Sequence, residues 1–557
     1  MFYKLQSLQS TWQRISFSVA FPYITLFVWT TPLLLLSSGE NSLIAHDEAL
    51  YAWRARQIFD SGDWVSAWSN IHHKTPGFYW LIASFYQLFG VNEFTVRLPS
   101  MICGIFSLLL VYEIGKIILN QKLAWLATAI LSLEFLWLQY CRLGNPDMPM
   151  IFLILLAIYS LIQAELYPNY KYSSGLIFIA GLSLGLGFLV RSFVIVLPTV
   201  ALLPYLIFEH RRHRHLTNPW LYLGLMSGFI PIFVWSWFNW QRHSNNIFAT
   251  LVEFVLRLGS EERDGNGILF YFWNISLKAF PWTFFSLLGL FLVILRPKLH
   301  YHLILVGFPI ILFVELSIFS TRLSHYGLCL YPFIALLAAI GLDWLGKIYD
   351  MGYATRKPWR QKGNILRILS YACSVIGILF LIAAIVVFIW GDRLHSIVGD
   401  GVPTSLADRK YAVIGLIVGL SWFIVPMVWI GRYKFGCKFL TSSYWIAGWL
   451  IPCWLALAFA GGFGLLGDYN PTYRTFLQQP AIASILQDHP IHFVQVNGKN
   501  SVLLNFYTPV HGQKVDTIAQ LPPSSYAWVD QNNSPEISRP HRIIGEVDNY
   551  KLIQVQP

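Results

Sequence analysis

The chain has 557 residues, of which 55% are hydrophobic and only 12% are charged, and its mean hydropathy is +0.52. A soluble protein carries about 25% charged residues, so this composition excludes a soluble enzyme or binding domain of this length. A net charge of +11 could indicate nucleic-acid binding, but basic residues also gather in the cytoplasmic loops of membrane proteins. The sequence therefore predicts a multi-pass, α-helical membrane protein with the lipid bilayer, and no nucleic acid, as its partner.

Apolar runs of about 20 residues, the length that crosses a bilayer as a helix, recur along most of the chain. We therefore expect about thirteen membrane-spanning helices. The expected spans are Phe17–Ser37, Thr95–Leu119, Leu123–Tyr140, Met148–Tyr167, Ser173–Leu189, Ser192–Phe208, Leu221–Trp240, Phe272–Leu295, Leu303–Phe319, Tyr326–Gly346, Leu366–Trp390, Ala412–Ile430 and Tyr444–Leu465. The apolar run Phe78–Phe89 is too short to cross and is expected at the membrane surface or in a re-entrant segment.

Basic loops set the expected orientation. Three segments rich in Arg and Lys, Glu209–His215, Arg356–Lys362 and Arg432–Lys438, all lie on one side of the membrane if the spans are as assigned. The positive-inside rule then predicts a cytoplasmic N-terminus. No small-residue cleavage site follows Phe17–Ser37, so this first span is expected to remain in the protein. With an odd number of spans, the C-terminus lies outside.

The last part of the chain has a different character, with polar composition, turn signals and short β-rich runs. We predict a helix at Ala481–Gln487 and strands at His492–Val496, Val502–Tyr507, Tyr526–Val529, Ile543–Val547 and Leu552–Val555,. The expected organisation is a transmembrane domain over residues 1–466, with a first outer loop at 38–94, and a small extracytoplasmic α/β domain over 467–557.

Two neighbouring carboxylates, Asp47 and Glu48, lie just outside the first expected span, in AHDEALYAWRARQIF at Ala45–Phe59. The pattern that follows them is typical of an amphipathic helix. Charges at a membrane boundary are costly unless they are paired or line a watery cavity. Carboxylates in such a cavity suit a general base or a divalent metal, and the residues alone leave both roles open.

Basic residues from separate loops share the same predicted outer face. They are Lys74, Arg191, Arg257 and Arg322, together with Arg142 or Arg97. Any one arginine could instead extend to lipid headgroups. Several cations from different loops, gathered beside acidic residues, suit a phosphate diester or pyrophosphate.

The order of motifs in the first outer loop resembles that of the polyprenyl-phosphate-sugar-dependent glycosyltransferases of GT-C fold. Within them, the chain is most similar to the lipid A aminoarabinose transferase group, which is itself related to the protein O-mannosyltransferases. The segments that carry the resemblance are HDEALYAWRARQIFDSGDW, HKTPGFYWLIASFYQLFGVNEFTVRLPS, GLGFLVRSF, EFVLRL, YFWNISLKAFPW and STRLSHYGLCLYPFIALLAA. The similarity is dense as far as Pro332, and Arg191-Ser192 stands where the family often has Lys-Gly.

This resemblance implies a GT-C fold with amphipathic helices in the first outer loop, and an enzyme that inverts the anomeric centre in one displacement. It implies Asp47 as general base, Glu48 as its support and Asp147 as a second acidic residue of the catalytic site. It also implies a donor phosphate bound by cationic and phenolic side chains, namely Lys74, Arg191, Arg257, Arg322 and Tyr326. No cofactor is certain, although a divalent metal at the acidic pair is the alternative.

The implied donor is a sugar on undecaprenyl or dolichyl phosphate. The implied acceptor is a hydroxyl or phosphate group of lipid A, another glycolipid or a protein, at the outer face of a bacterial inner membrane. A different class, a transporter or flippase of an anionic lipid or lipid-linked sugar, often has internal repeats and mid-span sites, which the sequence does not show. A catalytically inactive relative would not need Asp47, Lys74 and Asp147.

Overall fold

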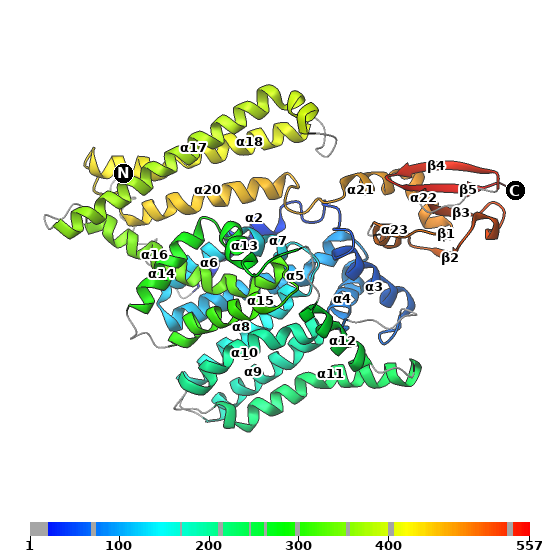
Figure 1. Cartoon of the computed structure of the whole chain (residues 1–557), viewed down its shortest axis with the longest axis horizontal. Helices are drawn as coiled ribbons and strands as arrows, with labels where there is room; N and C mark the ends of the chain where they lie inside the picture. The colour runs from blue at the N-terminus through cyan, green and yellow to red at the C-terminus, as the bar shows by residue number, and fades with distance from the viewer. Residues whose placement is uncertain are drawn as a thin grey trace, which may run out of the picture.

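The computed structural model describes residues 20–67, 74–167, 170–209, 215–243, 247–260, 265–295, 301–351, 357–398, 406–498, 500–531 and 539–556. It is a large bundle of helices with a small sheet at the C-terminal end (Figure 1). The predicted class, a mostly helical chain with a C-terminal α/β region, is confirmed.

The first outer loop forms two helices after the apolar helix α2 (Phe21–Leu35), namely α3 (Glu48–Ser61) and α4 (Gly77–Phe89). Small residues at every third position, Ala49, Ala52 and Ala55, are fully buried on α3. They give α4 a close packing surface, where it buries Tyr79 and other large side chains. With 13 residues, α4 is shorter than a membrane span.

The helical bundle follows. Its helices are α5 (Glu93–Ile118), α6 (Gln121–Ser132), α7 (Phe135–Cys141), α8 (Asp147–Leu166), α9 (Tyr170–Arg191), α10 (Val196–Pro204), α11 (Pro219–His243), α12 (Ile247–Ser260), α13 (Phe270–Lys278), α14 (Trp282–Ile294), α15 (Phe308–Ile318), α16 (Tyr331–Met351), α17 (Lys357–Val398), α18 (Leu406–Ser421), α19 (Ile424–Tyr433) and α20 (Ser442–Gly462).

In the described residues, eight helices are long and apolar enough to cross a membrane. The number is up to ten if each of two bent helix pairs is one span. The bends are 73° between α6 and α7 and 112° between α13 and α14. The protein is therefore an integral membrane protein. The predicted thirteen spans and their orientation are not confirmed, because several of the predicted spans are helices that are bent or too short to cross a membrane singly.

The chain reverses at the end of α9. Ser192 has φ of +56° and begins the 3₁₀ turn η1 (Ser192–Ile195). A Cβ added to Gly187 would lie 2.7 Å from the side chain of Ile195, which a continuous helix over these eight positions would keep far apart. The turn places Arg191 at the same end of the bundle as Asp147, with which it forms an ion pair.

Close backbone packing fixes α9 against α11. A Cβ on Gly181 would lie 2.0 Å from the carbonyl oxygen of Leu221, and one on Gly224 would lie 2.0 Å from that of Phe178. Small residues allow this approach between membrane helices, where packing rather than the hydrophobic effect drives association. The position of Arg191 is therefore set by a rigid helix pair.

The C-terminal region begins with α21 (Pro471–Leu477) and α22 (Pro480–Asp488) and contains a five-stranded sheet in the order β2-β1-β3-β5-β4. The strands are β1 (Ile491–Val494), β2 (His511–Val515), β3 (Tyr526–Asp530), β4 (His541–Val547) and β5 (Tyr550–Val555). Strand β1 is parallel to β2 and β3, whereas β5 is antiparallel to β3 and β4.

One predicted strand is wrong. Val502–Tyr507 lies in a helix, α23 (Ser501–Tyr507), and the unpredicted strand β2 follows it. Parallel neighbours need a crossover connection, usually a helix, and α23 is the connection between β1 and β2. Strand β2 carries mostly exposed residues, as an edge strand does, so its sequence has no apolar alternation.

The C-terminal region packs directly on the first outer loop. Residues of α3 and α4 share one hydrophobic core with α21, α23 and the sheet, and Figure 1 shows α23 beside α3. Polar contacts cross the same interface. Arg56 donates to the Phe506 carbonyl at 2.6 Å, Tyr507 donates to Glu93 at 2.8 Å, and Arg474 forms an ion pair with Glu93 at 3.1 Å. The loop that carries Asp47 is thus held between bundle and sheet.

Candidate active site

A cavity of about 850 Å³ lies where the first outer loop meets the bundle. Its walls come from the loop before α3, the segment before α8, the turn after α9, one face of α12, the end of α13 and the 3₁₀ turn η5 (Ser324–Leu330). Of the eight side chains predicted to form the site, seven line this cavity: Asp47, Glu48, Lys74, Asp147, Arg191, Arg257 and Tyr326.

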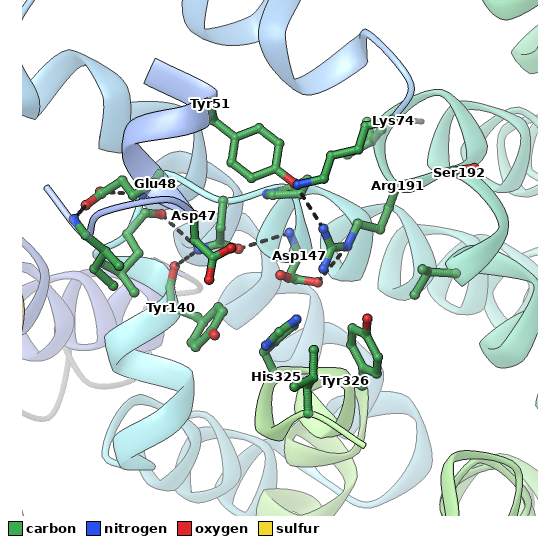
Figure 2. A pocket seen from close by; sticks show the side chains of 18 of the residues that line it. Asp47, Glu48, Tyr51, Lys74, Tyr140, Asp147, Arg191, Ser192, His325 and Tyr326 are labelled. Carbon is green, nitrogen blue, oxygen red and sulfur yellow. Dashed lines mark hydrogen bonds and ion pairs between the residues drawn. The ribbon is translucent and has the colours of Figure 1, made fainter. Parts of the chain in front are cut away.

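Asp47 is the residue before α3, and its exposed side chain points into the cavity (Figure 2). Its neighbour His46 has φ of +71°, a left-handed conformation that is uncommon for non-glycine residues and recurs at functional sites. The carboxylate makes no hydrogen bond or ion pair with any residue in the described ranges. Asp47 is therefore available to a ligand.

Glu48 differs sharply from its neighbour, because it is only 2% exposed and fully engaged. One carboxylate oxygen accepts from Arg97 Nε and the Gly144 amide, both at 2.8 Å. The other accepts from Arg97 Nη2 and the Ile44 amide, both at 3.0 Å. The remaining Arg97 donors bind the Ser38, Asn41 and Ser42 carbonyls at 2.7–3.0 Å. Glu48 thus holds the loop that presents Asp47.

Asp147 and Arg191 form the second polar element of the cavity. Asp147 begins α8, where the positive end of the helix dipole favours a carboxylate. Its Oδ1 lies 3.0 Å from Arg191 Nε, and both side chains are largely buried. Arg191 also donates to the Tyr51 hydroxyl at 3.2 Å. Figure 2 shows this pair between Asp47 and Ser192.

Two further cations reach the cavity from its rim. The Lys74 ammonium lies 4.5 Å from the centre of the Tyr51 ring, a cation–π contact. Arg257 lies on α12, where its guanidinium forms an ion pair with Glu253 at 2.5 Å. Thr250, Glu253 and Arg257 all line the cavity, as residues on one face of a helix do.

Arg322 occupies a different position from the one predicted. It is 6% exposed and is not among the residues that line the cavity. Its Nε donates to the Ser317 carbonyl at 3.1 Å, and its Nη1 donates to the Asn266 carbonyl at 2.6 Å. The structure therefore does not bring Arg322 to the cavity with the other predicted phosphate ligands, and the described contacts of its guanidinium hold the chain around η5.

The structure adds His325 and Tyr469, to which sequence reasoning gave no role, to the cavity. His325 projects from η5 toward Asp147 beside the predicted Tyr326 (Figure 2), and the His325 ring stacks on Tyr140 with centroids 5.6 Å apart. Tyr469 lines the cavity from the segment before α21, and burial raises the pKa of its phenol, so it remains a neutral donor. The signal for His325 was its place beside Tyr326 in the motif STRLSHYG.

No three His, Cys, Asp or Glu side chains of the described residues come together as a metal-binding group. Within those ranges, Asp47 is the available carboxylate of the acidic pair, since the oxygens of Glu48 are occupied.

The family model described as dolichyl-phosphate-mannose-protein mannosyltransferase matches residues 73–237. An uncharacterized protein of Aquifex aeolicus is 27% identical over 317 residues, which are 55% of this chain and 62% of that protein. The undecaprenyl phosphate-alpha-4-amino-4-deoxy-L-arabinose arabinosyl transferase of Yersinia enterocolitica is 24% identical over 371 residues. That match also spans only 62% of the relative's length.

The crystal structure of ArnT from Cupriavidus metallidurans bound to undecaprenyl phosphate has the same fold. The TM-score is 0.72 over 96% of this chain and 98% of that chain, at 16% sequence identity. The GT-C fold expected from the sequence is thereby confirmed. So is the resemblance to polyprenyl-phosphate-sugar-dependent glycosyltransferases, on which fold, family model and relatives agree.

Proposed function

We propose that this protein is an integral-membrane glycosyltransferase that moves a sugar from a polyprenyl-phosphate donor to an acceptor hydroxyl, with inversion at the anomeric carbon. The observation that carries the proposal is the shared cavity, in which the available carboxylate of Asp47 lies with the cations Lys74, Arg191 and Arg257. A carboxylate base and a set of cations are what a weak hydroxyl nucleophile and a phosphate leaving group require.

The reaction would proceed in one displacement. Asp47 accepts the proton of the acceptor hydroxyl as its oxygen attacks the anomeric carbon. The bond between that carbon and the phosphate oxygen breaks, and its electron pair leaves with the polyprenyl phosphate. The charge on the leaving phosphate grows, and it would be stabilised by Lys74 and Arg257, with the Tyr326 hydroxyl as a further donor.

Arg191 is assigned a different part in this scheme. Its guanidinium already pairs with Asp147 through Nε and so balances the negative charge of that carboxylate. The terminal nitrogens of the guanidinium would face the sugar donor. Asp147 would therefore act by holding Arg191, and not as a second base. Glu48 would act by holding the loop of Asp47.

The donor class is supported by the undecaprenyl-phosphate enzymes that the chain resembles. A glycolipid, lipid A included, or a protein is the proposed acceptor, and the outer face of a bacterial inner membrane is the proposed location. A divalent metal at Asp47 remains the competing arrangement, in which the ion would hold the phosphate.

Release of polyprenyl phosphate tests the proposal. Purified protein in liposomes is supplied with a radiolabelled sugar on undecaprenyl phosphate and with a membrane extract as acceptor. A glycosyltransferase transfers the label to an acceptor and leaves undecaprenyl phosphate. If instead the intact donor crosses the bilayer without cleavage, the protein is a flippase of lipid-linked sugar.

We predict that Lys74 and Arg257 bind one phosphate. Lys74→Met and Arg257→Gln should each weaken donor binding, and the double variant should lose less than the sum, since groups that serve one ligand are coupled. Arg322→Gln is the matched control, because Arg322 binds backbone carbonyls and its loss should lower the unfolding temperature instead. Donor dissociation constants of the four variants check this. Strictly additive losses would assign the two cations to different groups.

Topology provides a second prediction. From the basic loops and the odd number of expected spans, we predict that residue 360 lies in the cytoplasm and the C-terminus outside. Reporters fused after Arg360 and after Pro557 should therefore give signals from opposite compartments, as read with a pair of enzymes that are active on only one side of the membrane. The same compartment for both fusions would refute the odd number of spans.

A further inference from the structure

The cations predicted to bind the donor phosphate already have partners within the protein. Arg191 pairs with Asp147 and Arg257 with Glu253. Lys74 lies over the Tyr51 ring. A phosphate that binds them must share each cation with its partner, so the cavity holds less available positive charge than its composition suggests.

Lys278 is in a different situation. It is the last residue of α13, it is partly buried, and it lines the same cavity. Its ammonium makes no hydrogen bond or ion pair with any residue that the structure describes. Neither composition nor motif singled it out, because it lies inside the aromatic run YFWNISLKAFPW.

The face of α13 that carries Lys278 is the one packed on η5. The Tyr271 hydroxyl donates to the Leu323 carbonyl at 3.0 Å, and a Cβ on Gly327 would lie 3.3 Å from Ile275 Cδ1. Lys278 lies seven residues after Tyr271 and three after Ile275, so it is on this same face. It is thus directed to the turn that carries His325 and Tyr326 in the cavity.

The other face of α13 is open and apolar. Phe272 is 70% exposed, Trp273 52% and Leu277 69%, and the helix belongs to an apolar pair, bent by 112°, that forms a broken span or a re-entrant segment. This face contacts lipid in a membrane. Lys278 therefore lies between the lipid-facing surface and the cavity.

A lysine at this position needs an anion. An unpaired ammonium that is partly buried beside a lipid-facing apolar surface is costly, and such residues pair with a ligand or line its pathway. An ammonium offers three donors on a flexible stem and binds phosphate as a point charge. The ligand of the proposed function has both a phosphate for the cavity and an apolar tail for the surface of α13.

We propose that Lys278 is a further donor-binding residue, whose ammonium binds a phosphate oxygen of the polyprenyl-phosphate donor at the side of the cavity that faces the lipid. The isoprenoid tail then leaves along the apolar face of α13. This inference rests on the proposed function. Lys278 would thus be a phosphate-binding side chain whose positive charge no residue of the described chain neutralises.

The test measures binding of undecaprenyl phosphate to the purified full chain in detergent. Lys278→Met should weaken binding about 10-fold to 100-fold, the value of one charge-assisted hydrogen bond, and Lys278→Arg should restore most of it. Lys171→Met, at an exposed lysine at the start of α9, is the matched control and should bind as wild type does. Unfolding temperatures of all variants show whether each is folded.

Three results would overturn the proposal. Unchanged undecaprenyl phosphate affinity in folded Lys278→Met, with normal binding by wild type, refutes the role of Lys278 alone. An equal loss of phosphatidylglycerol binding would show that the lysine serves ordinary anionic lipids. Absence of undecaprenyl phosphate binding by wild type would refute the proposed function together with this inference.

Discussion

Asp47→Asn is expected to lower turnover about 10²–10⁴-fold, the usual contribution of a positioned acid–base group, with donor affinity nearly unchanged. The asparagine keeps the size of the side chain but cannot accept the proton of the acceptor hydroxyl. The phosphate contacts proposed for Lys74 and Arg257 would remain. Turnover and donor dissociation constants of the purified variants check both parts of the expectation.

Asp60→Asn is the matched control, because Asp60 lies on the same helix, is 48% exposed and pairs with Arg56 outside the cavity. It should leave turnover near that of wild type. A chelator distinguishes a general base from a bound metal ion. If Asp47 binds a divalent metal, chelation should abolish wild-type activity, and Asp47→Asn should bind the donor more weakly. Near-normal turnover of Asp47→Asn would refute its assignment as base whatever the chelator does.

Arg97→Gln is expected to have the largest effect on stability, about 3–5 kcal/mol of unfolding free energy. Arg97 is 1% exposed and spends its donors on Glu48 and on three carbonyls of the loop before α3. Its loss leaves Glu48 buried and unpaired. Turnover should fall more than donor affinity, because the loop that positions Asp47 loosens while the phosphate contacts stay.

The double variant Arg97→Gln/Glu48→Gln distinguishes loss of the Arg97–Glu48 ion pair from general destabilisation of the fold. Removing the unpaired charge should recover part of the lost stability, so the double variant should be more stable than the sum of the single changes implies. Lys551→Gln, which breaks a half-exposed ion pair with Glu546, should cost only about 0–1 kcal/mol. If thermal unfolding shows that the two single changes lower stability additively, the proposed coupling between Arg97 and Glu48 is contradicted.

The catalytic loop shows how much of the site could be predicted from the sequence. The acidic pair before an amphipathic pattern located the loop, and the resemblance separated Asp47 from Glu48. The physical cause of that separation could not be predicted, because the partners of Glu48 lie 49 and 96 residues away at Arg97 and Gly144. Such contacts follow from tertiary packing and leave no local pattern.

The differences from the predicted picture have similar physical origins. Arg322 was predicted to share a face with the other cations, but two of its donors bind carbonyls that the local chain path brings near. Lys278 lies in an aromatic run, and the sequence does not show which face of that helix packs on η5 and which face is exposed. The predicted thirteen spans stay unconfirmed, because an apolar run does not reveal bends such as the 112° angle between α13 and α14. In the sheet, an apolar run was taken for a strand when the parallel order of β1 and β2 required a helix.

Mass spectrometry of the glycolipids and glycoproteins of cells that produce wild type, Asp47→Asn or no protein tests the central claim most directly. The account predicts that one defined sugar is present on an outer-face acceptor only with wild type, and that Asp47→Asn cells, with normal protein levels, match cells without the protein. An unchanged sugar profile without the protein, or full modification in Asp47→Asn cells, would contradict sugar transfer by this cavity.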